Sequence, residues 1–287
     1  MADPKLKQRI KDGELVLAPG VFDLISALIA DRTGFPALYV TGYGTVASYL
    51  GLPDAGLATY RDMIERIGQM VKRTNTPVIA DADTGYGGLL NVRHTVRGYE
   101  EAGVSAMQME DQEFPKKCGH TKNRRVVPLE DMVRKIEVAV DSRQSDDFLI
   151  IARTDSRTGL GLDEAIRRGK AFAKAGADIV FVESPESEDE MKRVADEIDA
   201  PLFANMVNGG RTPLLSAARL KELGYSIAIH PAIGFLSMGA ALQKAYADLL
   251  ANGETSADID LYDFSEFNKL LGFEDVWDFE AKYAEVS

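Results

Sequence analysis

The sequence is short of the features that mark membrane and secreted proteins. Its 287 residues contain a single cysteine, Cys118, so no internal disulfide can form, which favours a reducing compartment. No run reaches the roughly 18 apolar residues that a membrane span needs, and the N-terminal segment is too polar for a signal peptide. We therefore expect a cytoplasmic protein without a membrane partner.

Positive charge is also scarce. The 33 lysines and arginines are outnumbered by 45 aspartates and glutamates, which gives a net charge of −12. Because such a chain repels the phosphate backbone, nucleic acid is not expected as a partner. A small anionic substrate requires cations that gather locally, and they do so around Cys118 in FPKKCGHTKNRR, residues 114–125.

Short apolar runs alternate with segments of helical spacing along most of the chain. Eight runs are predicted to be strands, at 15–19, 36–41, 76–81, 104–110, 148–154, 177–183, 200–206 and 225–231. They are almost continuously apolar, as expected of parallel strands covered on both faces. This pattern predicts a (β/α)8 barrel over residues 1–252, with an open doubly wound sheet as the alternative. The acidic, aromatic segment 253–287 predicts one or two further helices.

Acidic side chains gather at the predicted carboxyl ends of the strands, where a barrel carries its active site. Asp81 and Asp83 follow one strand, Glu110 ends the next, Asp54 lies in an earlier loop, and no cationic partner is apparent from the sequence. Such oxygen ligands suit Mg²⁺, or Mn²⁺, and the sequence holds no Cys/His set for zinc. The alternative is that DADTGYGG at 81–88 is an Asp-rich turn.

Arg153 closes an apolar run, where a charge needs an anionic partner. Its planar guanidinium could hold a substrate carboxylate through two hydrogen bonds, or form a structural ion pair with Glu183 or Asp155. Asn205 could donate its amide to the same carboxylate, or cap the next helix. Both interpretations stay open for each residue.

The cationic loop gives its thiol the setting of a reactive cysteine. Lys116, Lys117 and His120 would favour ionisation of Cys118, and Gly119 beside it is typical of a loop that closes over a bound substrate. The alternative is a surface thiol that happens to lie in a basic loop.

Together these segments resemble the isocitrate lyase/phosphoenolpyruvate mutase superfamily. KKCGH at 116–120 is similar to the lyase signature, and it occurs in order with DADTGYGG at 81–88, MED at 109–111, ARTD at 152–155 and NM…GGRTP at 205–213. The resemblance implies a (β/α)8 barrel that binds Mg²⁺. It also implies a homotetramer in which pairs of subunits exchange a C-terminal helix.

The resemblance further implies roles for individual residues. The metal site would comprise Asp54, Asp81, Asp83 and Glu110. Cys118 would be the acid/base, and the catalytic group would also include Tyr39, His120 and Arg153. The substrate contacts would be Thr41, Gly42, Tyr43, Lys117, Gly119, Arg153, Glu183 and Asn205.

The activity that the resemblance implies is cleavage of a carbon–carbon bond in a 2-hydroxy dicarboxylate. A substituted malate such as 2,3-dimethylmalate would give a 2-oxo acid and a carboxylic acid. Members that cleave 2-methylisocitrate carry arginines for a third carboxylate near Leu236 and Phe264, and both positions are apolar here. The alternatives are a 2-methylisocitrate lyase, an oxaloacetate hydrolase or decarboxylase, a phosphonate-handling member, and a barrel that binds a dicarboxylate without turnover.

Overall fold

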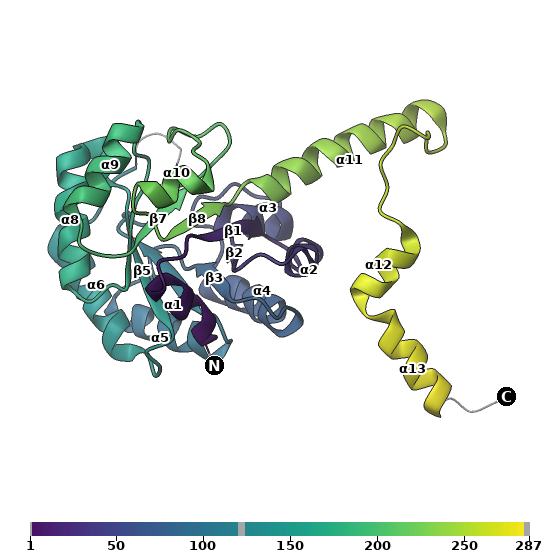
Figure 1. Cartoon of the computed structure of the whole chain (residues 1–287), viewed down its shortest axis with the longest axis horizontal. Coiled ribbons are helices and arrows are strands. Elements are labelled where there is room, and N and C mark those ends of the chain that lie inside the picture. The colour runs from purple at the N-terminus through teal and green to yellow at the C-terminus, as the bar shows by residue number, and fades with distance from the viewer. Residues whose placement is uncertain (1, 120–123, 284–287) are drawn as a thin grey trace. The chain divides into compact units, whose positions relative to one another are not determined.

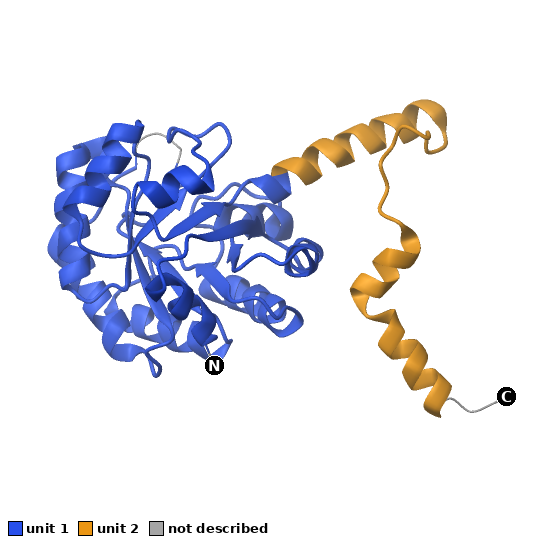
Figure 2. Ribbon diagram, viewed as in Figure 1, with its two compact units in different colours: residues 1–235 blue, residues 236–287 orange. Residues whose placement is uncertain are grey.

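The computed structural model describes residues 2–119 and 124–283. The chain divides into two compact units, residues 1–235 and 236–287 (Figure 2). The division falls within the helix α11 (Ile233–Asn252), earlier in the chain than the boundary at 252 expected from the sequence.

Unit 1 is a closed barrel of parallel strands in which each strand pairs with the next and β1 pairs with β8 (Figure 1). All eight predicted strands are present, so the barrel is confirmed and the open sheet is excluded. The strands are β1 (Val16–Val21), β2 (Leu38–Val40), β3 (Val78–Asp81), β4 (Ala106–Glu110), β5 (Leu149–Thr154), β6 (Ile179–Val182), β7 (Leu202–Asn205) and β8 (Ile227–His230).

Helices surround the strands, and several of them begin at a residue whose side chain caps the helix. In α4, for example, Met63, Ile67 and Met70 are buried on one face, and Thr59 and Asp62 form a capping box at the start. The helices of unit 1 are α1 (Pro4–Lys11), α2 (Leu24–Thr33), α3 (Gly42–Leu50), α4 (Tyr60–Arg73), α5 (Leu89–Glu101), α6 (Leu129–Ser142), α7 (Ser156–Leu160), α8 (Leu162–Lys174), α9 (Glu188–Glu197) and α10 (Ala217–Glu222).

Two apolar layers stabilise the barrel. The inner layer fills the barrel itself and includes Ile79, Ile151, Phe181 and Phe203. The outer layer lies between the strands and the helices, as with Met107, which is fully buried. Because every strand is covered on both faces, its sequence is apolar at successive positions and turns polar only where the strand ends.

The carboxyl ends of the strands carry the polar residues that the sequence placed there. Asp81, Glu110 and Asn205 are the last residues of β3, β4 and β7. Just beyond strand ends, Asp83 and Ser184 adopt left-handed backbone angles, with φ of 48° and 60°. Such conformations cost non-glycine residues energy and occur preferentially at functional sites.

Unit 2 holds most of α11 together with α12 (Phe264–Leu271) and α13 (Phe273–Tyr283). Its large apolar side chains are mostly exposed, and Leu250 and Phe264 reach 90% and 79% exposure. Within the described residues, no helix is both long and apolar enough to cross a membrane.

Candidate active site

A cavity of about 80 Å³ opens at the carboxyl ends of the strands. This volume has room for only a handful of water molecules, so it suits a small molecule and not a polymer. Its lining includes twelve of the predicted site residues, Tyr39, Thr41, Tyr43, Asp54, Asp81, Glu110, Lys117, Cys118, Gly119, Arg153, Glu183 and Asn205, and also Lys116 of the cationic loop. Of the other predicted residues, Gly42 and Asp83 lie directly behind the lining, and His120 lies outside the described residues.

The carboxylates on one side of the cavity have a cationic partner that the sequence did not reveal. The Lys116 ammonium lies 2.7 Å from Asp54 and 2.5 Å from Asp83, and all three side chains are almost completely buried. The expectation that these carboxylates lack cationic partners was therefore wrong. The pKa of Asp83 is raised to about 7, chiefly by burial. The negative charge of Asp81 also raises this pKa, whereas the positive charge of Lys116 lowers it.

Asp81 is held at the centre of this side by neutral donors. Its Oδ1 accepts hydrogen bonds from the backbone N–H of Asp83 at 3.0 Å and from the side-chain amide of Gln108 at 3.3 Å. A Cβ atom on Gly42 would lie 2.5 Å from the other carboxylate oxygen, so only glycine fits at the start of α3. This explains why Gly42 belongs to the site without lining the cavity.

The donor set fits magnesium better than a metal that needs a full cage of side chains. Among the described residues, no group of three or more Asp, Glu, His or Cys side chains is arranged to hold a metal ion. Magnesium usually keeps several waters and takes only one or two carboxylates. Asp81 and Glu110 both line the cavity and can supply them. Burial raises the pKa of Glu110 well above its ordinary value, a cost that a bound cation would offset.

Arg153 also lines the cavity, and its guanidinium is already paired. Its Nε and Nη2 atoms donate to the two oxygens of Asp155, both at 2.9 Å. Glu110 lies 3.4 Å from its Nη1 atom, and Glu183 lies 3.4 Å from Nη2, the atom that also donates to Asp155. Asp155 therefore occupies the Nε–Nη2 edge of the guanidinium, so Arg153 does form a structural ion pair. A substrate carboxylate can approach only the other edge, which Nη1 and Nη2 form.

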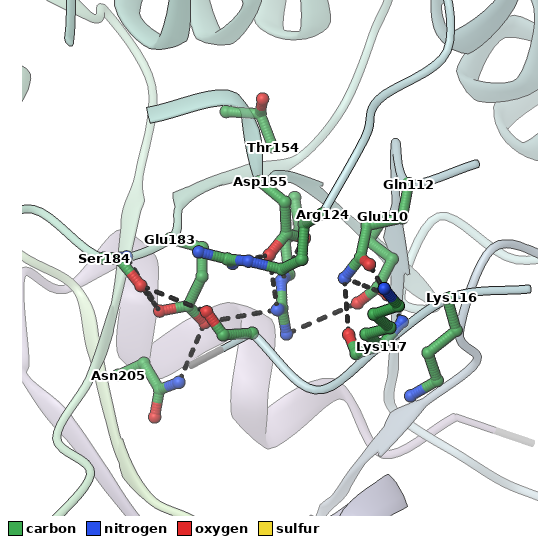
Figure 3. A network of polar contacts seen from close by, with 12 residues as sticks. Glu110, Gln112, Lys116, Lys117, Arg124, Thr154, Asp155, Glu183, Ser184 and Asn205 are labelled. Carbon is green, nitrogen blue, oxygen red and sulfur yellow. Dashed lines mark hydrogen bonds and ion pairs between the residues drawn. The ribbon is translucent and has the colours of Figure 1, made fainter. Parts of the chain in front are cut away.

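Asn205 donates its side-chain amide to Glu183 at 2.9 Å (Figure 3). It does not cap a helix, because α10 begins much later and is capped by Ser216. Glu183 also accepts a hydrogen bond from the backbone N–H of Ser184 at 2.7 Å. Asn205 and Glu183 thus form one polar unit beside Arg153.

The cationic loop lies against the site. The side-chain amide of Gln112 donates to Glu110 at 2.9 Å and to the carbonyl of Lys117 at 2.8 Å, and its oxygen accepts the Lys117 N–H at 3.0 Å. A Cβ atom on Gly119 would lie 2.2 Å from Nη2 of Arg153. The half-buried Cys118 between them lines the cavity, and its N–H donates to the Asp54 carbonyl at 3.2 Å.

Tyr39 is buried in the floor of the cavity. Its hydroxyl donates to Gln108 at 2.8 Å. Burial raises the pKa of Tyr39 well above its ordinary value, and the negative charge of Asp81 adds to the shift. The phenol is held protonated, which disfavours Tyr39 as the base considered from the sequence.

The remaining wall of the cavity is apolar. Tyr43 stacks on Phe235 with ring centroids 5.1 Å apart, and Phe22 packs edge-on against Phe235 at 6.3 Å. The other members of this apolar wall are Val207, Ile229, Pro231 and Ala232. A ligand in the cavity therefore meets charges on one side and hydrocarbon on the other.

Three polar residues around the cavity were not predicted from the sequence, namely Gln108, Gln112 and Arg124. The signal for Gln108 was available, because it is the one polar residue inside the apolar run of β4 before Glu110. Gln112 and Arg124 lie in polar loop sequence, where nothing distinguishes a residue that folds back onto the site.

The fold and the site define a (β/α)8-barrel enzyme, and comparisons with known proteins specify its family. The model of the phosphoenolpyruvate phosphomutase family matches residues 6–250. The 2,3-dimethylmalate lyase of Eubacterium barkeri is 49% identical, covering 98% of this chain and 97% of that protein. The 2-methylisocitrate lyase of Aeropyrum pernix is 40% identical, covering 98% and 90%.

A solved structure agrees with these relatives. An oxaloacetate acetylhydrolase in complex with 3,3-difluorooxalacetate matches with a TM-score of 0.92 at 32% identity, covering 97% of this chain and 95% of that one. The chain belongs to the phosphoenolpyruvate mutase/isocitrate lyase superfamily, as predicted. The lyases among its relatives also confirm the predicted enzyme class, a carbon–carbon lyase.

Proposed function

We propose that the protein cleaves the C2–C3 bond of an alkyl-substituted malate such as 2,3-dimethylmalate, giving a 2-oxo acid and a carboxylic acid. The observation that carries the proposal is the two-sided cavity. Its lining combines Cys118, Arg153 and the carboxylates with the residues of the apolar wall. A substituted malate has the matching halves, since it bears two carboxylates and hydrocarbon groups on the carbons between them.

The charged side positions the substrate and stabilises the charge that develops. The outer edge of Arg153 and the amide of Asn205 would bind one carboxylate, and Lys117 adds positive charge from the loop. When the C2–C3 bond breaks, its electron pair stays on C3 beside that carboxylate. The resulting enediolate carries extra negative charge, so fixed cations stabilise it more than they stabilise the substrate.

Proton transfer completes the reaction. The C2 hydroxyl loses its proton to a base, and the Cys118 thiol delivers a proton to C3, which balances the reaction after the thiol is reprotonated. Cys118 lines the same cavity as Arg153, which supports this role. Tyr39 could serve as the base only after losing the proton that it now shares with Gln108.

The cofactor that fits this site is Mg²⁺, with Mn²⁺ as a substitute. We propose that Asp81 and Glu110 bind it directly or through its waters, and that Asp54 and Asp83 contribute charge while paired with Lys116. When bound, the ion would stabilise negative charge on the C2 oxygen as the carbonyl forms.

The apolar wall favours alkyl substituents over a third carboxylate. A carboxylate placed against Val207, Ile229 and Phe235 would lose its hydration without gaining a partner. The 2-methylisocitrate lyase of Aeropyrum pernix is nevertheless a relative, and 2-methylisocitrate is the second candidate substrate. Oxaloacetate, the third, needs water as the attacking group.

A substrate panel tests the proposal. Malate, 2-methylmalate, 2,3-dimethylmalate, 2-methylisocitrate and oxaloacetate would be incubated with the enzyme and Mg²⁺, and pyruvate, glyoxylate and oxalate would be measured. We expect 2,3-dimethylmalate to be cleaved with the highest kcat/KM. A higher kcat/KM for 2-methylisocitrate or oxaloacetate would contradict the proposal.

We further propose that unit 2 assembles with other copies of the chain into a homotetramer. Its exposed apolar side chains, such as Leu250, Phe264 and Trp277, are typical of surfaces that a partner covers. Light scattering at micromolar concentration should give the mass of a tetramer, and a monomer would contradict the proposal. Because the chemistry needs a reduced Cys118, we also propose a cytoplasmic location, which cell fractionation would refute by finding the protein elsewhere.

A further inference from the structure

Asp155 is the meeting point of two buried arginines, Arg153 and Arg124, of which Figure 3 labels Arg124. Arg153 donates to both of its oxygens at 2.9 Å, and Nη1 of Arg124 donates to Oδ1 as well. The exposed fractions of the side chains are 8% for Arg153, 1% for Arg124 and 0% for Asp155. No water can take over these contacts, so each partner is fixed by the others.

Arg124 is anchored on its far side too. Its Nη2 donates to the hydroxyl of Thr158 in α7 at 2.6 Å. Its Nε is buried and has no hydrogen-bond partner among the described residues. An arginine that buries a donor at this cost is held in place by its ion pair with Asp155.

The charges around Arg153 show what Arg124 contributes. Three carboxylates, Asp155, Glu110 and Glu183, surround the Arg153 guanidinium. Burial alone would raise the pKa of Asp155, but its contacts with Arg153 and Arg124 lower it, so Asp155 stays ionised. Without Arg124, one guanidinium would face three carboxylates alone, and a substrate anion would meet a more negative site.

The position of Arg124 in the chain adds a second consequence. Cys118 lies between two buried ion pairs, because Lys116 pairs with Asp54 and Asp83 on one side and Arg124 pairs with Asp155 on the other. The contact that fixes Arg153 therefore also anchors the chain six residues after the thiol.

We infer that Arg124 is a positioning residue that acts through Asp155. It holds the Arg153 guanidinium in the orientation that meets the substrate carboxylate, and it holds Cys118 against the same cavity. The kinetic part of the inference rests on the proposed function, whereas the effect on the thiol does not.

The single cysteine provides a direct readout. In Arg124→Gln, iodoacetamide should alkylate Cys118 about tenfold faster than in the unmodified protein, because local opening exposes the thiol. If the substitution only removed a nearby positive charge, the thiol would ionise less and alkylation would be slower. A faster rate therefore indicates that the thiol has become more accessible. Arg125→Gln is the matched control, since the Arg125 side chain is 80% exposed and pairs with Glu113.

Kinetics on the best malate provide the second readout. Arg124→Gln should raise KM about 10- to 100-fold and also lower kcat, since both the binding arginine and the acid lose their alignment. Arg124→Lys should recover part of both losses, because it restores the charge without the fork. The inference would be overturned if Arg124→Gln had the same alkylation rate and the same KM as the unmodified protein and Arg125→Gln.

Two further outcomes remain decisive. If no malate is turned over even by the unmodified protein, the proposed function fails, and the alkylation rates still test Arg124. If Arg124→Gln does not fold, as judged by its thermal melting, Arg124→Lys carries the test. Alkylation about threefold faster than in the unmodified protein would support the inference, and an unchanged rate would overturn it.

Discussion

The two sides of the cavity are built by different forces. On the charged side, Lys116, Arg153 and Arg124 hold their carboxylates through buried ion pairs. On the apolar wall, the ring of Phe235 is held by packing, stacked on Tyr43 and edge-on to Phe22. Removing one partner of a buried ion pair leaves a charge without compensation, whereas a packed wall can adjust to a small change in shape.

This difference separates turnover from selectivity. Groups on the charged side interact with charge that develops during bond cleavage, so changes there should lower kcat. The apolar wall contacts substituents that do not react, so changes there should alter the choice of substrate.

Removal of divalent metal should have the largest effect. Without a cation, the carboxylates of Asp81 and Glu110 face the substrate's carboxylates across one small cavity, and like charges repel. Activity on the best malate should be abolished in excess EDTA and should return with Mg²⁺ or Mn²⁺. A rise in melting temperature on adding Mg²⁺ would report binding independently of activity. Full turnover in chelator would contradict the metal assignment.

Cys118→Ser should lower kcat by about 10²–10⁴-fold, the usual contribution of a positioned acid, because a serine hydroxyl is much less acidic than a thiol. The hydroxyl is nearly isosteric, so the affinity for substrate, measured by equilibrium binding, should stay close to that of the unmodified protein. A kcat within two- to threefold of the unmodified value would show that the thiol is not the proton donor.

Gly119→Ala should have a smaller effect on turnover. The new Cβ would lie 2.2 Å from Nη2 of Arg153 and 3.0 Å from Glu183, so Arg153 or the loop must shift. A displacement of this size near reacting groups typically lowers kcat/KM by roughly 10- to 100-fold. Gly68→Ala in α4 is the control, since its nearest neighbour would be 3.9 Å away. Equal kcat/KM in the two variants would show that Gly119 does not need to lie so close to Arg153.

The same contrast explains how much could be predicted from the sequence. The strands were predictable because burial on both faces leaves a local pattern, and the placement of Asp81, Glu110 and Asn205 followed because each ends a strand. The pairing of Lys116 with Asp54 was not predictable, since it depends on how a loop folds back, which no local pattern encodes.

Arg153 shows the limit most clearly. The sequence indicated that a charge at the end of an apolar run needs an anion, and it correctly named Asp155 as one candidate. It could not decide between Asp155 and a substrate carboxylate, because both satisfy the same guanidinium. That decision depends on distance, and the structure places Asp155 at 2.9 Å on both Nε and Nη2.

The smallest expected effect belongs to the apolar wall and concerns selectivity alone. Val207→Thr keeps the shape of the side chain but replaces one methyl group with a hydroxyl, which should disfavour an alkyl substituent placed against it. A methyl contact in an apolar pocket is worth roughly tenfold in kcat/KM at the low end. We therefore expect the ratio of kcat/KM for 2,3-dimethylmalate to that for malate to fall about three- to tenfold, with kcat for malate unchanged. Val133→Thr, at a half-buried position of α6 that does not line the cavity, should leave the ratio as it is. If Val207→Thr instead lowers kcat equally for both substrates, the wall takes part in the chemistry, and the separation between the two sides of the cavity fails.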